Sequence, residues 1–152
     1  MTNREAFCAL LAWSEGTSTI PGSDRGYDVL VGGTLFTTGY ADHPRVKINL
    51  GHGLNSTAAG RYQILAHWFD AYKQYLKLPD FSPASQDAIA LQMIGECKAL
   101  DDIDAGNIAS AITKCASRWA SLPGAGYGQR ENTIEGLMKI YQESGGVAQV
   151  ST

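Results

Sequence analysis

A short amphipathic helix at the start of the chain, ending on a carboxylate, is the sequence feature that most constrains the fold. Thr2 is followed three residues later by Glu5, the spacing of a capping box, which predicts that a helix begins here. Gly16 is a typical residue just past a helix C-terminus, so Glu15 is predicted to stand at the helix end. The predicted buried face of this helix consists of Phe7, Leu10 and Leu11.

The predicted position of Glu15 favours a protonated carboxyl. A helix C-terminus carries partial negative charge, which disfavours an anion there. The neighbouring Ala12 and Trp13 add apolar surroundings, which raise a carboxyl pKa in the same direction. A carboxyl that is still protonated near neutral pH can act as a general acid. From these residues alone, an ordinary solvated glutamate at a helix end is the alternative interpretation.

After Gly16 the helical pattern stops for about fifty residues. Short apolar runs at 27–31 and 35–38 flank a Gly-Gly pair, which predicts a hairpin. A third strand is predicted at 46–49, and the polar stretch 51–57 is predicted to be a loop. This part of the chain, about residues 20–60, is therefore expected to form a small β-rich lobe.

From Leu65 onward the spacing of apolar residues predicts helices. Ser82 and Pro83 predict an N-cap and a first helical position. We expect one α+β domain spanning residues 1–152, in which a bundle of helices closes back on the first helix. The predicted apolar faces are Leu65, Trp68, Phe69, Tyr72 and Leu76; then Gln86, Ile89, Ala90, Met93, Ile94 and Cys97; then Ile108, Ala111, Ile112, Cys115 and Trp119; and finally Ile134, Leu137, Met138 and Tyr141.

Composition narrows the class of protein. The 152 residues are 44% apolar and 18% charged, with a formal net charge of −3, which fits an ordinary globular chain and argues against nucleic-acid binding. No stretch resembles a signal peptide or a membrane span, so synthesis in the cytoplasm is expected. The cysteines and histidines show no metal-ligand spacing, so we expect free, buried thiols and neither a metal nor a cofactor. These residues are Cys8, Cys97, Cys115, His43, His52 and His67.

Two glycine-rich stretches, 57–65 and 122–129, border predicted helices and are candidates for lining a ligand cleft. Glycine lets the backbone approach a ligand, while tyrosine and glutamine offer a stacking face and amide hydrogen bonds. This combination suits a sugar. A phosphate loop is a weaker interpretation of 122–129, because the preceding strand and the full motif are missing. An ordinary loop between helices is the remaining alternative.

Several blocks together resemble the lambda-type endolysins of bacteriophages, in the same order along nearly the whole chain. The blocks are AWSEGT at 12–17, GYDVLVGGTLF at 26–36, DHPR at 42–45, STAAGRYQIL at 56–65, FSPASQDAIALQ at 81–92 and WASLPGAGYGQ at 119–129. The resemblance implies a lysozyme-like fold, in which a mainly helical lobe and a small β-rich lobe flank an active-site cleft. It also implies a lytic transglycosylase that cleaves peptidoglycan between N-acetylmuramic acid and N-acetylglucosamine.

The resemblance implies a role for individual residues as well. Glu15 falls on the catalytic position, and the GRYQ block is similar to the Gly-Leu-Met-Gln element of other lytic transglycosylases, which places Gln63 at the substrate. Tyr127 matches the cleft tyrosine of those enzymes, and Tyr62 is expected to help position the sugar. The chain departs from them at Gly16, where they usually have serine, and in its acidic net charge, whereas phage lytic enzymes are often basic.

The expected function is host cell lysis by a transglycosylase that forms 1,6-anhydromuramic acid with Glu15 alone. A hydrolytic muramidase using Glu15 and Asp24 is the second hypothesis, because the spacing of the two acids resembles that of T4-type muramidases. A non-catalytic peptidoglycan-binding or virion domain is the third. We expect a monomer without stable membrane association that acts on glycan strands in the periplasm after a holin-type membrane protein permeabilises the membrane.

Overall fold

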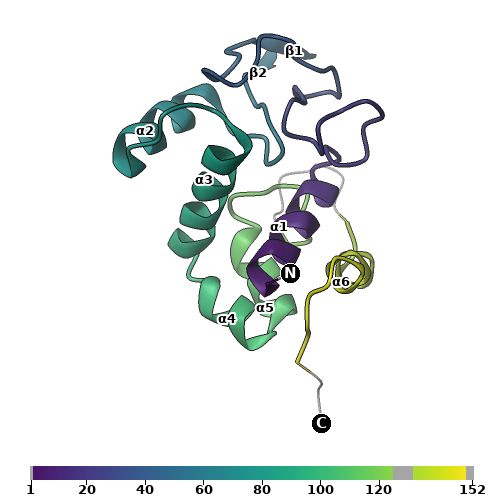
Figure 1. Ribbon diagram of the computed structural model, residues 1–152. Coiled ribbons are helices and arrows are strands. Elements are labelled where there is room, and N and C mark those ends of the chain that lie inside the picture. The colour runs from purple at the N-terminus through teal and green to yellow at the C-terminus, as the bar shows by residue number, and fades with distance from the viewer. Residues whose placement is uncertain (1, 125–131, 150–152) are drawn as a thin grey trace. The chain divides into compact units, whose positions relative to one another are not determined.

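The computed structural model describes residues 2–124 and 132–149, and the chain divides into two compact units (Figure 1). One unit comprises Met1–Glu15 together with Ala90–Thr152, and the other comprises Gly16–Ile89. The boundary between Glu15 and Gly16 therefore falls directly after the predicted catalytic position. No helix among the described residues is long and apolar enough to cross a membrane.

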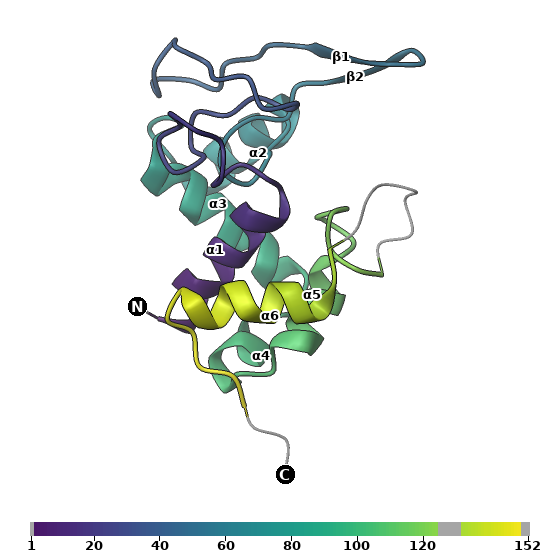
Figure 2. The ribbon, with the colours of Figure 1, turned by 90° about the vertical axis from the view of Figure 1, so that its right-hand side faces the viewer.

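The first unit is built around α1 (Asn3–Ser14), which is contacted by α4 (Leu100–Ala105) and α6 (Ile134–Glu143). The helix α5 (Ile108–Cys115) packs on both α4 and α6 (Figures 1 and 2). Burial of apolar faces on these helices forms one core. Its fully buried or nearly fully buried side chains include Phe7, Leu10, Leu11, Met93, Ile94, Ile103, Ile108, Ile112, Trp119, Leu122, Leu137 and Tyr141.

The predicted start of α1 is confirmed in detail. The backbone N–H of Glu5 donates to Thr2 Oγ1 at 3.1 Å, and the backbone N–H of Thr2 donates to Glu5 Oε2 at 3.0 Å. These reciprocal bonds complete the capping box and satisfy donors that a helix start leaves unpaired. The far end also agrees, because Gly16 has φ +78°, the left-handed conformation that ends helices.

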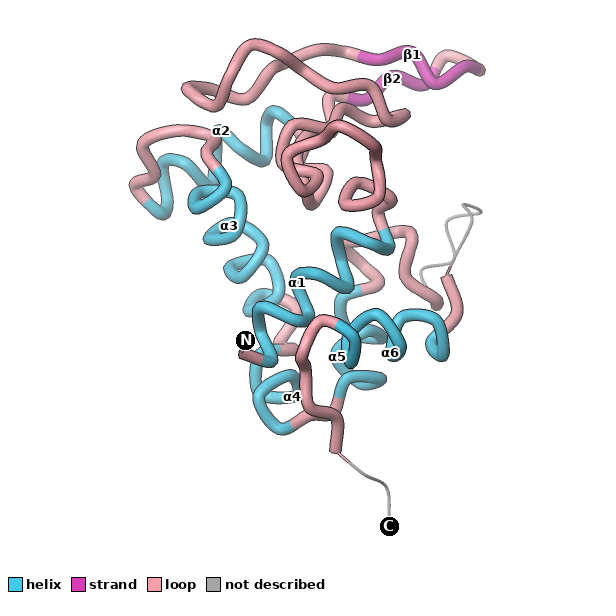
Figure 3. Tube along the Cα trace, turned by 45° about the vertical axis from the view of Figure 1, so that its right-hand side comes forward, coloured by secondary structure: helices cyan, strands magenta, loops and turns pink. Residues whose placement is uncertain are grey.

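The second unit contains α2 (Ala66–Leu76) and a two-stranded antiparallel sheet of β1 (Ile48–Gly51) and β2 (Leu54–Ser56). Ile48 pairs with Ser56 and Asn49 with Asn55, and an irregularity follows before Gly51. Long loops make up most of the chain between α1 and β1, as the pink trace in Figure 3 shows. The β-rich lobe is thus mainly loops. The prediction of a loop at 51–57 was wrong, because β2 lies there.

The predicted hairpin at 27–38 is reduced to a single bridge between Val29 and Leu35. Its ladder hydrogen bonds run from the Leu30 N–H to the Thr34 carbonyl at 2.7 Å and from the Phe36 N–H to the Asp28 carbonyl at 2.9 Å, and the other edge of the segment pairs with the loop before α2. The N–H of Gly60 donates to the carbonyl of Val29 at 2.8 Å, and the N–H of Val31 donates to the carbonyl of Ala58 at 3.1 Å. The segment is therefore paired on both edges, with 34–36 on one side and with the loop that precedes α2 on the other.

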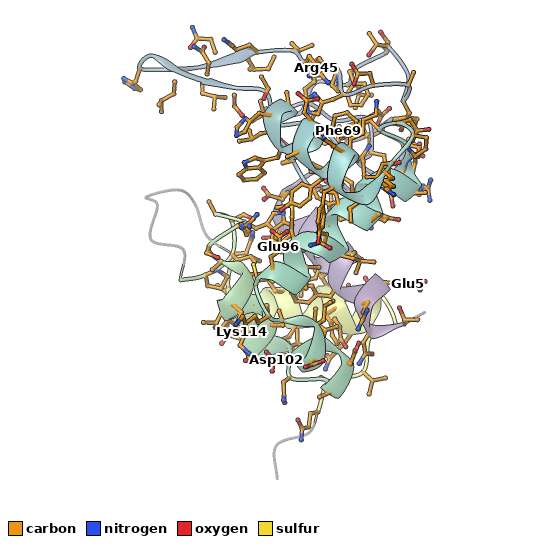
Figure 4. All side chains as sticks on the ribbon, turned by 90° about the vertical axis from the view of Figure 1, so that its left-hand side faces the viewer. Glu5, Arg45, Phe69, Glu96, Asp102 and Lys114 are labelled. Atoms are coloured by element: carbon orange, nitrogen blue, oxygen red, sulfur yellow. The ribbon has the colours of Figure 1, made fainter. Side chains whose placement is uncertain are left out.

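An aromatic cluster forms part of the core of the second unit. The His43 ring lies 4.9 Å from the Phe81 ring and 5.9 Å from the Phe69 ring, measured between centroids. His43 Nε2 contacts the Ile64 carbonyl at 2.8 Å, and the Arg45 N–H donates to Nδ1, so the ring is neutral with its proton on Nε2. Burial, the largest influence, lowers the pKa of His43. The guanidinium of Arg45 stands over the Phe69 ring (Figure 4).

The helical half follows the predicted pattern with several differences. Of the predicted α2 face only Phe69 is buried, and Ile134 of the predicted last face is exposed. The helix α3 (Pro83–Glu96) begins at the predicted proline, and the Ser85 N–H donates to Ser82 Oγ at 3.4 Å. The predicted α3 face is buried except for Cys97, which is partly exposed. The predicted helix through Trp119 ends at Cys115 and continues only as turns. The helix α4 was not predicted, because its six residues carry too few apolar positions to show a period.

The close approach of Gly60 to α3 generates a stability prediction. Gly60 has φ +84°, and a Cβ there would overlap the buried Gln86 side chain and contact the Phe81 ring. We expect Gly60→Ala to lower the free energy of unfolding by about 3 kcal/mol, because strain and overpacking add. Gly22 is the matched control: its φ is +80°, but nothing lies within 4 Å of a Cβ, so Gly22→Ala should cost about 1 kcal/mol. Urea unfolding of both variants measures the difference, and equal losses would contradict it.

Candidate active site

The C-terminal end of α1 places Glu15 at the junction of the two units in the sequence. Glu15 is the C-cap residue, with φ −74° and ψ −9°, and its N–H donates to the Leu11 carbonyl at 2.9 Å. The peptide that carries this side chain is therefore held by the last hydrogen bond of the helix. Gly16 follows in the left-handed conformation, so the chain leaves the helix axis directly after the carboxylate.

The Glu15 carboxyl is partly withdrawn from solvent, and this withdrawal determines its acidity. Burial raises the pKa of Glu15 from 4.5 to about 7. The cause is desolvation, because the ionised form loses hydration that the neutral form does not need. The helix end and the apolar neighbours of Glu15 in the sequence predict this direction. A carboxyl with this pKa exchanges a proton readily near neutral pH, which general acid–base chemistry requires.

Tyr62 is buried, and its hydroxyl binds to a carboxylate on α3. The Tyr62 hydroxyl donates to Asp87 Oδ1 at 2.6 Å, and the Tyr27 hydroxyl donates to the same oxygen at 2.8 Å. The two rings meet edge to face with centroids 6.4 Å apart. Asp87 therefore joins the loop before α2 to the segment that follows Gly26. A role for Tyr62 at the substrate stays a prediction, since its observed contacts are with protein.

Gln63 occupies a strained backbone conformation, with φ +56°. Its side-chain Nε2 donates to the Gly60 carbonyl at 2.9 Å and to the Val29 carbonyl at 3.2 Å. Tyr62 and Gln63 are thus fixed by different partners, the former by Asp87 and the latter by backbone carbonyls. Strained residues held by their surroundings cluster at functional sites, which makes Gln63 a candidate for substrate contact.

Arg61 completes this loop and connects it to the segment after α1. The Arg61 carbonyl accepts a hydrogen bond from Thr17 Oγ1 at 2.6 Å, and its N–H donates to the buried Gln86 Oε1 at 2.9 Å. The guanidinium lies over the Tyr27 ring, 5.2 Å from the centroid, and donates to the Arg25 carbonyl. Thr17 is only two residues beyond Glu15. The loop of 60–63 is therefore built into the same unit as the start of the chain that follows the glutamate.

Asp24 is placed as a turn residue. Its carboxylate accepts a hydrogen bond from the Tyr40 hydroxyl at 2.8 Å and pairs with Arg25 at 3.3 Å, and its N–H donates to Asp28 Oδ1. The Tyr40 hydrogen bond is the main reason that the pKa of Asp24 is lowered. These contacts account for an aspartate at this position without a catalytic role.

Three further sets of residues belong to the predicted site or could have bound a metal there. Tyr127 lies outside the described residues. The cysteines are free thiols, with Cys8 and Cys115 buried; burial and the neighbouring Cys97 thiol raise the pKa of Cys115. Among residues 2–124 and 132–149, no group of three or more histidine, cysteine or acidic side chains could hold a metal ion. Expecting neither a metal nor a cofactor stays a prediction.

Two side chains that organise these elements, Asp87 and Asn132, were not predicted from the sequence. Asp87 lies beside Gln86 in the block that resembles the endolysins, so a polar pair next to a buried helical face was the available signal. Asn132 carried no signal, because it lies outside every recognised block. Its contacts with the end of α1 appear only in the structure.

Comparison with known proteins decides the family. The Endolysin family model matches residues 5–148. The chain is 55% identical over 145 residues to the endolysin of Escherichia phage lambda, covering 94% of this chain and 91% of that protein. It is 49% identical over 156 residues to the endolysin of Escherichia phage P2, covering 95% and 94% respectively. The chain belongs to the endolysin family.

Solved structures agree with this endolysin assignment and with the predicted lysozyme-like α+β fold. Bacteriophage lambda lysozyme in complex with a chitohexasaccharide matches with a TM-score of 0.93 at 53% identity, covering 97% of this chain and 96% of that one. A second lambda lysozyme structure matches with a TM-score of 0.88 at 51% identity, with the same coverage.

The raised pKa of Glu15 predicts a trade-off between stability and activity in this endolysin. The folded chain favours protonated Glu15, so the stability that protonation contributes is complete below pH 4.5 and is lost as the pH rises through about 7. Glu15→Gln is neutral throughout, so above pH 7 it should exceed the wild type in free energy of unfolding by roughly 1–3 kcal/mol.

Chemical denaturation at pH 5 and pH 8 measures this difference. The matched control is Glu143→Gln, an exposed glutamate 3.9 Å from Lys139, whose substitution should change stability by less than about 0.5 kcal/mol at either pH. A Glu15→Gln protein that is less stable than the wild type at pH 8 would show that the carboxylate is favoured by the fold.

Proposed function

We propose that this endolysin is a lytic transglycosylase that cleaves the β-1,4 bond between N-acetylmuramic acid and N-acetylglucosamine in peptidoglycan. Membership of the endolysin family supports the coarser part of this proposal, a peptidoglycan-degrading enzyme. The observation that carries the finer part is the Glu15 carboxyl at the end of α1, with its pKa raised to about 7. One group with this pKa can both give and take a proton at neutral pH.

The proposed reaction uses this one carboxyl twice. Protonated Glu15 donates its proton to the glycosidic oxygen as the bond to the anomeric carbon of N-acetylmuramic acid breaks. The resulting carboxylate then takes the proton from the C6 hydroxyl of the same sugar, whose oxygen bonds to the anomeric carbon. Glu15 ends protonated again, the product is a 1,6-anhydro sugar, and no water is consumed.

Intramolecular attack explains why a second carboxylate is not needed. Hydrolysis usually requires a second acid as nucleophile or base. In a transglycosylase the nucleophile belongs to the substrate, and effective molarities for well-oriented intramolecular reactions reach on the order of 10⁵ M or more. The contacts of Asp24 with Tyr40 and Arg25 support a structural role for that residue, in agreement with this scheme.

Substrate contacts are assigned to the glycine-rich stretches. We assign hydrogen bonding with sugar hydroxyl or N-acetyl groups to Gln63, because its amide can donate and accept and its strained backbone is held by the loop. Tyr62 supports this loop through Asp87, and Tyr127 is assigned to the sugar by resemblance alone. The lambda lysozyme structure contains a chitohexasaccharide, which supports a β-1,4-linked amino-sugar polymer as the ligand class.

The proposed setting is the one that the resemblance to lambda-type endolysins implies. The enzyme is made in the cytoplasm of the host as a monomer, binds glycan strands and not nucleic acid, and reaches the periplasm after a holin-type protein permeabilises the membrane. The formal charge of −3 means that long-range attraction to an anionic cell wall does not drive binding, so recognition depends on contacts to the sugars.

A matched pair of substitutions separates one-carboxyl from two-carboxyl catalysis. Glu15→Gln removes the transferable proton with little change of shape and should lower the rate of peptidoglycan clearing by at least about a thousandfold. Asp24→Asn should keep most of the rate, because the contacts of Asp24 with Tyr40 and Arg25 are structural. Both are measured on purified peptidoglycan with folding checked by circular dichroism. A loss of several orders of magnitude in Asp24→Asn would favour the muramidase, and full activity in Glu15→Gln would place the chemistry elsewhere.

Product analysis in labelled water tests the proposal most directly. Intramolecular attack leaves 1,6-anhydromuramic acid ends, generates no new reducing groups and incorporates no oxygen from ¹⁸O water. Mass spectrometry of the released muropeptides detects all three features. Reducing ends that carry ¹⁸O from the wild-type enzyme would overturn the transglycosylase. A folded protein that binds peptidoglycan without releasing fragments would favour the non-catalytic binding domain.

A further inference from the structure

Asn132 joins two parts of the first unit that are far apart in the sequence. It lies between the range 125–131 and α6, and its side-chain Nδ2 contacts the end of α1. Nδ2 donates to Ser14 Oγ at 3.1 Å and to the Ser14 carbonyl at 3.2 Å, with a longer approach of 3.4 Å to the Ser121 carbonyl. The Asn132 backbone N–H donates to that Ser121 carbonyl at 2.9 Å. One amide side chain thus links α1 to the segment that precedes α6.

Ser14 is the last residue of α1 and the residue directly before Glu15. Its side chain is largely buried, 8% exposed, and its Oγ shares a 2.8 Å hydrogen bond with Ser121 Oγ. The last carbonyls of a helix have no partner within the helix. The Asn132 side chain supplies a hydrogen-bond partner to the Ser14 carbonyl. This carbonyl belongs to the peptide group that joins Ser14 to Glu15. The orientation of this peptide helps set the direction in which the Glu15 side chain leaves the backbone.

We propose that Asn132 is a positioning residue for Glu15. By holding the Ser14 carbonyl, it fixes the last turn of α1 and with it the place of the carboxyl that gives and takes the proton. This inference rests on the proposed catalytic role of Glu15. Catalysis depends steeply on such placement, because a displacement of about 1 Å can cost on the order of a hundredfold in rate. Asn132 itself touches no reacting atom in this scheme.

The chain offers a matched control one residue away. Thr133 is the N-cap of α6, and its Oγ1 accepts a hydrogen bond from the Gly136 N–H at 3.1 Å. Thr133→Ala weakens α6 through the loss of this cap. It leaves the Asn132 contacts with α1 in place. Asn132→Leu removes those contacts while keeping a side chain of similar shape. The two variants therefore separate a loss of stability from a loss of positioning.

The experiment measures kcat and KM on soluble, uncrosslinked glycan strands, well below the melting temperature of every variant. We expect Asn132→Leu to lower kcat about tenfold, with KM changed by less than twofold. Thr133→Ala should lower the melting temperature by a few degrees and change kcat by less than twofold. Ser14→Ala should lower kcat less than Asn132→Leu, because it keeps the carbonyl that Asn132 holds.

If Asn132→Leu yields no folded protein, Asn132→Asp is the substitute, because it keeps the shape of the side chain and removes the donor. The same loss of kcat is expected.

A double variant tests whether the loss of kcat in Asn132→Leu acts through Glu15. In a Glu15→Gln background, Asn132→Leu should cause no further loss of rate, because there is no proton donor left to position. An unchanged kcat in Asn132→Leu, an equal loss in Thr133→Ala, or a further loss in the Glu15→Gln background would each overturn the positioning role. Failure of the proposed function would be distinguishable: a single Glu15→Gln variant that kept its activity would remove the catalytic role of Glu15, and reducing ends carrying ¹⁸O would replace the transglycosylase by a muramidase while leaving the positioning test unchanged.

Discussion

The burial of the apolar face of α1 allows a carboxyl with an unfavourable charge to stand at the end of that helix. Phe7, Leu10 and Leu11 are fully buried, and a buried side chain of this kind contributes about 1.5–3 kcal/mol. Moving the pKa of Glu15 from 4.5 to about 7 costs roughly 3 kcal/mol when the group is ionised. The penalty is therefore of the same order as the contribution of one or two such core side chains. The fold tolerates a destabilising carboxylate at the end of α1 because the other turns of this helix are buried in the core.

The proposed substrate loop is held by side chains of α3 and not by a sheet. Gln86 is fully buried, and its Nε2 donates to the carbonyls of Tyr27 and Phe81 while its Oε1 accepts from the Arg61 N–H. Its neighbour Asp87 accepts from two tyrosine hydroxyls. A buried amide such as that of Gln86 is costly when unpaired, so its three hydrogen bonds favour one conformation of the loop. That conformation includes the positive φ of Gln63, which an isolated strand pair would not impose.

Local signals predicted the fold where the determinants are local. The capping box of Thr2 and Glu5, the Pro83 start of α3 and the buried face that contains Met93 were all readable, because each depends on residues within a few positions of one another. The same holds for the helix end at Gly16 and the resulting surroundings of Glu15.

The remaining features depend on partners that are distant in the sequence. The hairpin at 27–38 was predicted as a ladder of its own, but it is one bridge long and its outer edge bonds to Ala58 and Gly60, which periodicity cannot show. The burial of the Tyr62 hydroxyl against Asp87 and the bond from Asn132 to Ser14 cross 25 and 118 residues of sequence. The short helix α4 and the three-residue strand β2 are too brief to produce a recognisable pattern.

The central claim is that one carboxyl, at the end of α1, is kept protonated close to neutral pH by its surroundings. The most direct measurement is an NMR titration that follows the side-chain carboxyl carbon of ¹³C-labelled Glu15, assigned by comparison with Glu15→Gln. The account predicts a midpoint at a pH of about 7, set by burial of the group. A midpoint near the ordinary value of 4.5 would contradict it, because Glu15 would then be ionised at neutral pH and could not serve as the general acid.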